Sequence, residues 1–400
     1  MKVRSYRTNL WTMLLLGGCI AAPVPAQPSF SSTSTGSDGA LNFTTPGTVM
    51  FDPTTFQPPL NPSGNNIYNF TTINIAAGVT VRLSGRNLTG PVYWLASGAV
   101  TIAGTLDLNG ENGPAFSQSD ETRIPAYPGA GGYAGGVGGR PLSTPPLTPQ
   151  PGSGPGGGGA GSATSGMFNG NSGSNGTFAG TNFFLVPLVG GSGGGGGDGI
   201  DAVTIGGGGG GGGGAILIAS SSSITIAGVI RANGGAGGTC GSSGCGGNGS
   251  GGAIRLISPL VNGAGSLSAA QIRIETSSYP NTLTVTQPLT VSATPNLYLP
   301  AIPPGALKVV SVNGVALPAA PAASFTVPDA TINASAAVPV VIQAANIPPG
   351  TVPTLQFISD SGADFTVQAP ALTGTMAQST ATVQVTFPAG FSRGYVLATW

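Results

Sequence analysis

Short apolar runs with alternating side chains recur along the first three quarters of the chain. Residues 92–110 read VYWLASGAVTIAGTLDLNG, and residues 215–234 read AILIASSSSITIAGVIRANG, so that TIAG and NG return in both. Each copy holds three runs in which every second side chain is apolar, which is typical of β-strands. The pattern predicts a repeating unit of about twenty residues with three strands.

Partial copies extend the repeat in both directions. The tetrad NFTT at residues 42–45 returns at residues 69–72, and residues 253–258 echo the start of the second full copy. One unit has too little apolar surface to fold alone, whereas stacked units bury one another's inward faces. We therefore predict an all-β protein with a parallel β-helix over residues 40–290, in which Ile102 and Ile226 occupy equivalent inward positions.

The TIAG…NG and GGAI segments also carry a family resemblance. Through them, residues 40–290 resemble the Gly-rich, pectin-lyase-like right-handed β-helix proteins of bacterial cell surfaces. The resemblance implies the fold more firmly than any activity, because one fold hosts many functions.

Two glycine-rich insertions, residues 111–214 and 235–252, interrupt the repeat directly after its NG dipeptides. Equivalent exit points on successive windings predict that both insertions lie on one side of the coil. The first contains nine consecutive glycines at residues 206–214. Because glycine loses the most backbone entropy on folding, composition favours a disordered or loosely packed spacer. The alternative is a set of polyglycine-II strands, as in some Gly-rich adhesins, with contact residues or anchors at Tyr127, Tyr133, Phe168, Phe178, Phe183 and Phe184.

Composition narrows the possible functions. Seventy Gly and 35 Pro disfavour helices, and only 6% of residues are charged, against about 25% in ordinary soluble proteins. The formal net charge is zero and no basic patch exists, so nucleic-acid binding has no electrostatic basis. The absence of His removes the commonest general base and metal ligand.

The amino end predicts export from the cytoplasm. A basic start, an apolar run from Met13 and small residues before Gln27 predict a signal peptide over residues 1–26, cleaved after Ala26. The competing interpretation is a lipobox at residues 16–19, in which Cys19 carries a lipid anchor; this is the only membrane association expected. Both place the protein outside the cell or on its outer surface. Residues 27–39 are rich in Ser and Thr and are expected to form a flexible leader.

Past the signal, the two remaining cysteines are Cys240 and Cys245, in CGSSGC. In an oxidising compartment such a close pair usually forms a disulfide. A zinc site lacks its other two ligands, and the spacing is not that of a Cys-x-x-Cys redox pair.

Residues 193–201, GGGGGDGID, match the calcium-binding nonapeptide formally and would place Asp198 and Asp201 at the ion. A glycine tract meets most of these positions by chance, and no second copy follows. Calcium is therefore not favoured as a cofactor.

Arg82, Asp107 and Arg231 occupy equivalent outward positions on three units. Stacking them predicts a ladder of exposed ion pairs. The functional alternative is a polysaccharide groove like that of pectate lyases, for which one Asp is too few. The same alternation assigns the exposed-ladder interpretation to Arg255, Arg273 and Glu275.

A Pro-rich linker is expected over residues 291–305, followed by a second domain over residues 306–400. Seven short alternating runs separated by turns predict an immunoglobulin-like β-sandwich without cysteines. The runs are residues 307–312, 325–327, 338–343, 354–358, 365–368, 381–387 and 395–400.

These observations favour a non-catalytic structural or adhesive protein, secreted or on the cell surface, that presents glycine-rich loops. Its expected partner is an extracellular polysaccharide or another cell-surface component. The alternative is a polysaccharide lyase or hydrolase built on the same coil, because a fold does not determine function.

Overall fold

The computed structural model describes most of the chain from Phe30 onward. The described residues are 30–61, 64–118, 123–144, 146–162, 172–180, 183–280, 282–286, 288–294, 297–300, 305–318, 321, 327–359, 363–387 and 394–399. The predicted signal peptide with Cys19 and Ala26 lies outside them, as do Phe168 and the predicted strand residues Phe325 and Thr326.

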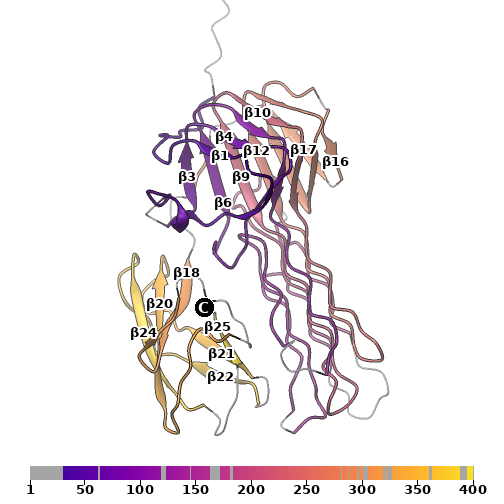
Figure 1. The fold of residues 1–400 in the computed structure, drawn as a ribbon, viewed down its shortest axis with the longest axis vertical. Coiled ribbons are helices and arrows are strands. Elements are labelled where there is room, and N and C mark those ends of the chain that lie inside the picture. The colour runs from indigo at the N-terminus through magenta and orange to yellow at the C-terminus, as the bar shows by residue number, and fades with distance from the viewer. Residues whose placement is uncertain are drawn as a thin grey trace, which may run out of the picture.

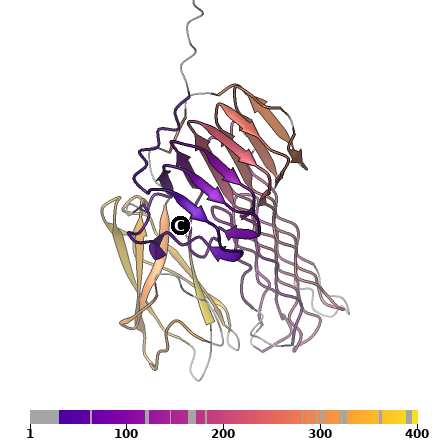
Figure 2. The same ribbon diagram turned by 45° about the horizontal axis from the view of Figure 1, so that its top comes forward.

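Residues 40–292 wind through three parallel sheets in rotation, an arrangement compatible with a parallel β-helix (Figures 1 and 2). The first sheet has the order β1 (Leu41–Phe43), β4 (Ile73–Ile75), β7 (Val100–Ile102), β10 (Ser223–Ile226) and β13 (Leu260–Asn262). The second has the order β2 (Gly47–Met50), β5 (Val79–Arg82), β8 (Thr105–Asp107), β11 (Val229–Ala232), β14 (Ser266–Ala269) and β16 (Thr284–Val285). The third has the order β3 (Ile67–Phe70), β6 (Val92–Ala96), β9 (Ala215–Ser220), β12 (Ala253–Ile257), β15 (Gln271–Glu275) and β17 (Leu289–Ser292). We call these three sheets the coil.

Stacked aliphatic side chains fill the coil. Ile226 of β10 pairs with Ile102 of β7, and both side chains are fully buried. Thr101, the residue before Ile102 in β7, points outward and is exposed. The predicted stacking of the sequence repeats is confirmed. Successive windings exclude water from one continuous apolar column, which is the main favourable contribution to folding.

The central strands of the third parallel sheet are buried on both faces, unlike those of the other two. All residues of β6, β9 and β12 are buried. Leu185 and Leu188 of the first glycine insertion cover the outer face, together with Leu297 and Leu299 of the linker. The continuous apolar run AILIAS of β9 reflects this double burial, since a strand covered on both faces does not alternate.

Chain that precedes and follows the first strands packs against the coil. A short 3-10 helix, η1 (Pro53–Thr55), lies beside Phe51, which is fully buried. Residues 30–39, expected to be a flexible leader, instead lie against the coil. The Ser32 hydroxyl donates to the Ala96 carbonyl at 2.6 Å, and the Asp38 amide donates to the Asn69 carbonyl at 2.9 Å.

The C-terminal unit, residues 306–399, consists of two antiparallel sheets. One has the order β19 (Val315–Ala316), β18 (Ala306–Val312), β20 (Val338–Ala345), β24 (Ser379–Val385) and β23 (Thr373–Gly374). The other has the order β22 (Phe365–Gln368), β21 (Thr354–Ser359) and β25 (Gly394–Thr399). Alternate side chains of β20 and β24 join Leu355 and Phe357 of β21 in one apolar core.

The C-terminal unit and the glycine-rich insertions extend from the same side of the coil, next to each other (Figures 1 and 2). Among the described residues, no helix is long and apolar enough to span a bilayer.

We predict that Ile226→Ala lowers the free energy of unfolding by about 2–5 kcal/mol, because it leaves a cavity in the stacked column. Thr101→Ala on the exposed face of the neighbouring strand is the control and should change it by less than about 0.5 kcal/mol. Urea unfolding followed by circular dichroism measures both. Equal effects of the two substitutions would contradict the stacked core.

Candidate functional surface: the glycine bundle

Both glycine-rich insertions leave the coil at the same corner and form one bundle. The Gly110 amide donates to the Asn233 carbonyl at 2.9 Å where they leave, and the Gly252 amide donates to the Ala232 carbonyl at 2.7 Å where the second returns. The described parts of residues 108–214 and 233–252 then run together as long, roughly parallel lines of chain (Figure 2). We call this assembly the glycine bundle.

The segment at residues 206–214 lies inside the bundle and bonds to three neighbouring segments in turn. Every third amide donates to the same neighbour, which is the signature of a three-residue helical turn such as polyproline II. The acceptors are Gly139, Gly136 and Tyr133 on one neighbour, Gly244, Gly247 and Ser250 on the second, and Pro114, Glu111 and Leu108 on the third. The amides of this segment are therefore all paired without any β-ladder.

Close backbone approach is what makes glycine necessary here. A Cβ added at Gly209 would lie 1.9 Å from the Gly194 carbonyl oxygen, and one at Gly212 would lie 1.9 Å from that of Gly191. All residues from 206 to 214 are buried. The insertion is thus a packed assembly and not the loose spacer that composition favoured, because inter-segment hydrogen bonds repay the backbone entropy lost by glycine.

On the outer surface of the bundle, Asn and Ser side chains accept hydrogen bonds from backbone amides. The exposed Asn112 accepts a hydrogen bond from the Ala236 amide at 2.9 Å, and the exposed Asn175 accepts one from the Asn248 amide at 2.8 Å. Asn248 in turn accepts from the Gly237 amide at 2.8 Å. These three outward amides are therefore paired by side chains.

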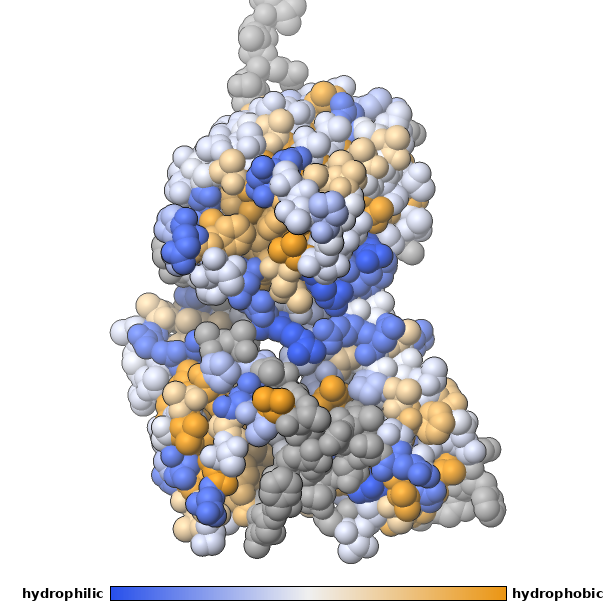
Figure 3. Space-filling model, viewed as in Figure 1, coloured by the Kyte–Doolittle hydropathy of each residue, from blue (hydrophilic) through white to orange (hydrophobic). Residues whose placement is uncertain are grey.

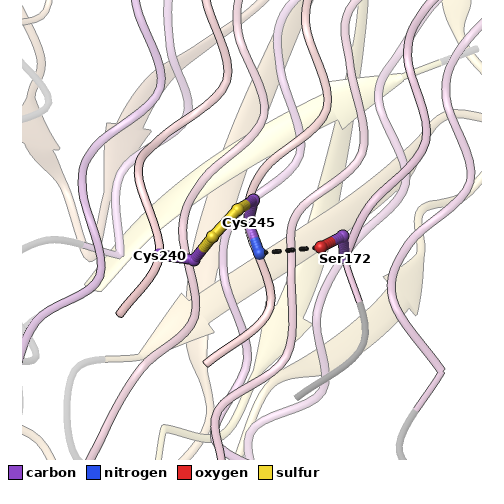
Figure 4. The surroundings of a disulfide bond; sticks show 3 residues. All are labelled: Ser172, Cys240 and Cys245. Carbon is purple, nitrogen blue, oxygen red and sulfur yellow. Dashed lines mark hydrogen bonds between the residues drawn. A yellow bond between two sulfur atoms is a disulfide. The ribbon is translucent and has the colours of Figure 1, made fainter. Parts of the chain in front are cut away.

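A disulfide lies within the glycine bundle, beside Ser172 of the first insertion (Figure 4). Cys240 and Cys245 are bonded, with their Cα atoms 4.5 Å apart. The Cys245 amide donates to the Ser172 hydroxyl at 3.0 Å, so the two insertions are tied together beside the cross-link.

The aromatic residues of the first insertion divide into anchors and exposed side chains. Tyr127 lies under the Arg86 guanidinium, 3.8 Å from the Cζ atom to the ring centroid, and Phe178 packs against the cluster that covers the third parallel sheet. Phe183 and Phe184 remain 67% and 63% exposed. Tyr133 is partly exposed as well.

The predicted charge column lies at the root of the bundle. Asp107 Oδ2 accepts from Arg82 at 3.1 Å and from Arg231 at 3.2 Å, and its Oδ1 accepts from the Asn109 amide at 3.0 Å. The carboxylate itself is buried, so the three residues are more than an exposed ladder. They hold the residues at which the first insertion leaves the coil.

Arg255, Arg273 and Glu275 are buried, contrary to the exposed ladder expected for them. Glu275 Oε1 accepts from Arg255 Nε at 2.8 Å and from Arg273 Nε at 2.6 Å. Arg273 also donates to the Phe183 carbonyl at 3.2 Å and lies 5.1 Å from the Phe184 ring centroid. The alternating pattern failed here because the insertion covers the outer face of these strands.

Asp198 and Asp201, the two residues of the calcium hypothesis, have different surroundings. Burial in the bundle raises the pKa of Asp198 to about 6, and among the described residues its Oδ1 has no hydrogen-bond partner. The backbone amides of Thr204 and Val203 hold the pKa of Asp201 below its usual value. Within the described residues, no group of three or more acidic, Cys or His side chains could surround a metal ion.

Asp107 and Glu275 each accept hydrogen bonds from two arginines. A shallow hollow beside the bundle root is lined by Asn233, Gly234, Gly251, Ala269 and Ala270, none of which is ionisable. The face in Figure 3 shows only separate apolar patches on a largely polar or neutral surface.

We predict that Gly209→Ala disrupts the bundle, because the added Cβ would overlap the Gly194 carbonyl oxygen of the neighbouring segment. Hydrogen exchange measures this: the amides of residues 206–214 should be protected in the parent protein and exchange much faster in the variant. Gly159→Ala is the matched control, since a Cβ there would meet only the Ser174 hydroxyl, at 3.4 Å. Rapid exchange in the parent protein would contradict a packed bundle.

We predict that Asp198→Asn raises Tm at pH 7.5. The folded pKa of about 6 lies above an unfolded value of about 3.9, so the carboxyl favours folding least when it is ionised. Its contribution is fully present below about pH 4 and is lost as the pH rises through 6. Differential scanning calorimetry should therefore show a gain in Tm for the variant that shrinks as the pH falls toward 4.

The same scans with calcium chloride or a chelator test the calcium hypothesis. A calcium ion held by Asp198 would raise Tm of the parent protein and not that of Asp198→Asn. If Asp198→Asn raises Tm by the same amount with and without calcium, burial of the carboxylate alone causes the gain.

Comparisons with known proteins add no function to this geometry. No family model matches the chain, and no match was found among curated proteins or solved structures. The function must therefore be inferred from the bundle and the coil that carries it.

Proposed function

We propose that the protein is a non-catalytic, adhesive display protein of the cell exterior. In this proposal the coil is a pectin-lyase-like parallel β-helix that serves as the scaffold, and the C-terminal unit is an immunoglobulin-like sandwich. The glycine bundle is the part displayed. The observation that carries the proposal is that the bundle is packed through its backbone and projects from one side of the coil.

The construction of the bundle supports display over mere spacing. A spacer needs only length, which an unpaired Gly-rich chain supplies without specific contacts. Here the amides of residues 206–214 are paired with backbone carbonyls, and the outer amides of Ala236 and Asn248 are paired with Asn side chains, so these segments are held in defined positions. Fixed loops bind with a smaller loss of conformational entropy than mobile ones.

Phe183 and Phe184 are the best candidates for the contact with a partner. Their rings are exposed, while the neighbouring Leu185 and Leu188 are buried on the third parallel sheet. Rigid aromatic side chains supply large contact areas, and their flat faces suit the apolar faces of sugar rings. We therefore propose an extracellular polysaccharide as the partner.

An exterior location is consistent with the predicted signal peptide, the disulfide and the uncharged polar surface. Both forms of export remain part of the proposal: secretion after cleavage at Ala26, or tethering through a lipid on Cys19.

We expect affinity electrophoresis to show slower migration of the protein in gels containing a neutral or an acidic polysaccharide. The double substitution Phe183→Ala and Phe184→Ala should abolish this retardation, because it removes both exposed rings. Tyr298→Ala is the matched control, since this side chain is 65% exposed but lies in the linker. Equal retardation of all three proteins would contradict a role for the insertion.

Assays of the same polysaccharides for newly formed reducing or unsaturated ends test the enzymatic alternative. We expect no turnover with or without calcium. Turnover that is lost in Asp107→Ala would show that the protein is a polysaccharide lyase or hydrolase.

A further inference from the structure

A fully buried arginine joins the glycine bundle to the C-terminal unit. Arg123 belongs to the first insertion, and its side chain is 0% exposed. Its Nη1 and Nη2 atoms donate to Asp364 Oδ1 at 3.0 Å and Oδ2 at 2.7 Å. Nη1 also donates to the Ser359 carbonyl at 2.8 Å, and Nε donates to the Gly138 carbonyl at 3.2 Å.

The four acceptors come from both parts of the molecule. Gly138 belongs to the bundle, Ser359 ends β21, and Asp364 lies directly before β22. The Ser359 amide donates to Asp364 Oδ1 at 3.1 Å, which fixes the carboxylate for two-point contact with the guanidinium. Each charge is balanced by the other, as burial of an ion requires.

Smaller contacts flank this ion pair. Val137 of the bundle and Ile358 of β21 are buried together, with Ile124 packed against them. The Gln356 side-chain amide donates to the Gln150 side-chain oxygen at 2.8 Å. These contacts are neutral, whereas Arg123 and Asp364 form a charged pair between the two parts.

We propose that the contact between Arg123 and Asp364 locks the C-terminal unit against the glycine bundle, so that both face a partner as one body. Loss of the contact frees the unit to move relative to the bundle. A pair of buried charges is suited to such a lock. A partial separation would leave each ion with neither water nor its counter-ion beside it, which is unfavourable. The inference does not depend on what the bundle binds.

The experiment measures the distance between the two parts by double electron–electron resonance. Spin labels are placed at two exposed positions, through Thr144→Cys in the bundle and Thr366→Cys in β22, in a chain carrying Cys19→Ser. The parent protein should give one narrow distance distribution. Arg123→Met should lose it in favour of a broad distribution.

Arg231→Met is the matched control, because it also removes an arginine from an ion pair, here with Asp107 at the bundle root at 3.2 Å. It should keep the narrow distribution. Hydrogen exchange of residues 206–214 and of β20 should be unchanged in Arg123→Met, which separates release of the unit from unfolding. A narrow distribution in folded Arg123→Met would overturn the proposal.

Asp364→Asn provides a second variant of nearly the same shape. It keeps one acceptor oxygen, replaces the other with an NH2 group that cannot accept from the guanidinium, and leaves Arg123 without a counter-charge, so the broad distribution should appear again. If Arg123→Met does not fold, the result for Asp364→Asn decides, and a narrow distribution there would equally overturn the proposal.

Discussion

The bundle depends on one constraint, which is that a buried backbone amide must find an acceptor. Residues 206–214 meet it with carbonyls from three surrounding segments, at intervals of three residues. Such neighbours can approach only where no Cβ intervenes, so the tract of glycines is a packing requirement. The coil meets the same constraint differently, with strand ladders and a column of aliphatic side chains. The two arrangements meet at the NG dipeptides, where the chain passes from the strand ladders of the coil into the backbone-paired segments of the bundle.

Few residues are charged, and several of them lie where parts of the molecule join. Asp107 and its two arginines lie at the bundle root, and Glu275 with its arginines lies beneath the covering loop of the third parallel sheet. Arg123 lies between the bundle and the C-terminal unit. Buried ion pairs stabilise less than apolar contacts of similar size, but they penalise wrong arrangements strongly. At these junctions, orientation matters more than raw stability, and apolar contacts alone would leave it loosely defined.

The coil was predictable because its strands carry their own periodicity. The equivalence of Ile102 and Ile226 follows from the repeated TIAG, and the structure pairs them. The column at Asp107 followed from the same register. The continuous apolar run of β9 also indicates that both faces of this sheet are buried. The alternating pattern around Arg255 and Glu275, in the neighbouring strands, instead suggested an exposed outer face. For Arg123 and Asp364 the sequence offers no signal, since they lie 241 positions apart in unpatterned segments.

The sequence by itself therefore determined the winding of the coil, the points where the insertions leave it, and the side they share, because each is a local period or a repeated motif. Whether the glycine segments are packed was decided only by the tertiary structure, since their hydrogen bonds connect segments that composition cannot pair. The burial of Glu275 and the docking of the C-terminal unit were decided there too. Both depend on which distant segment covers a surface, and no local pattern records that.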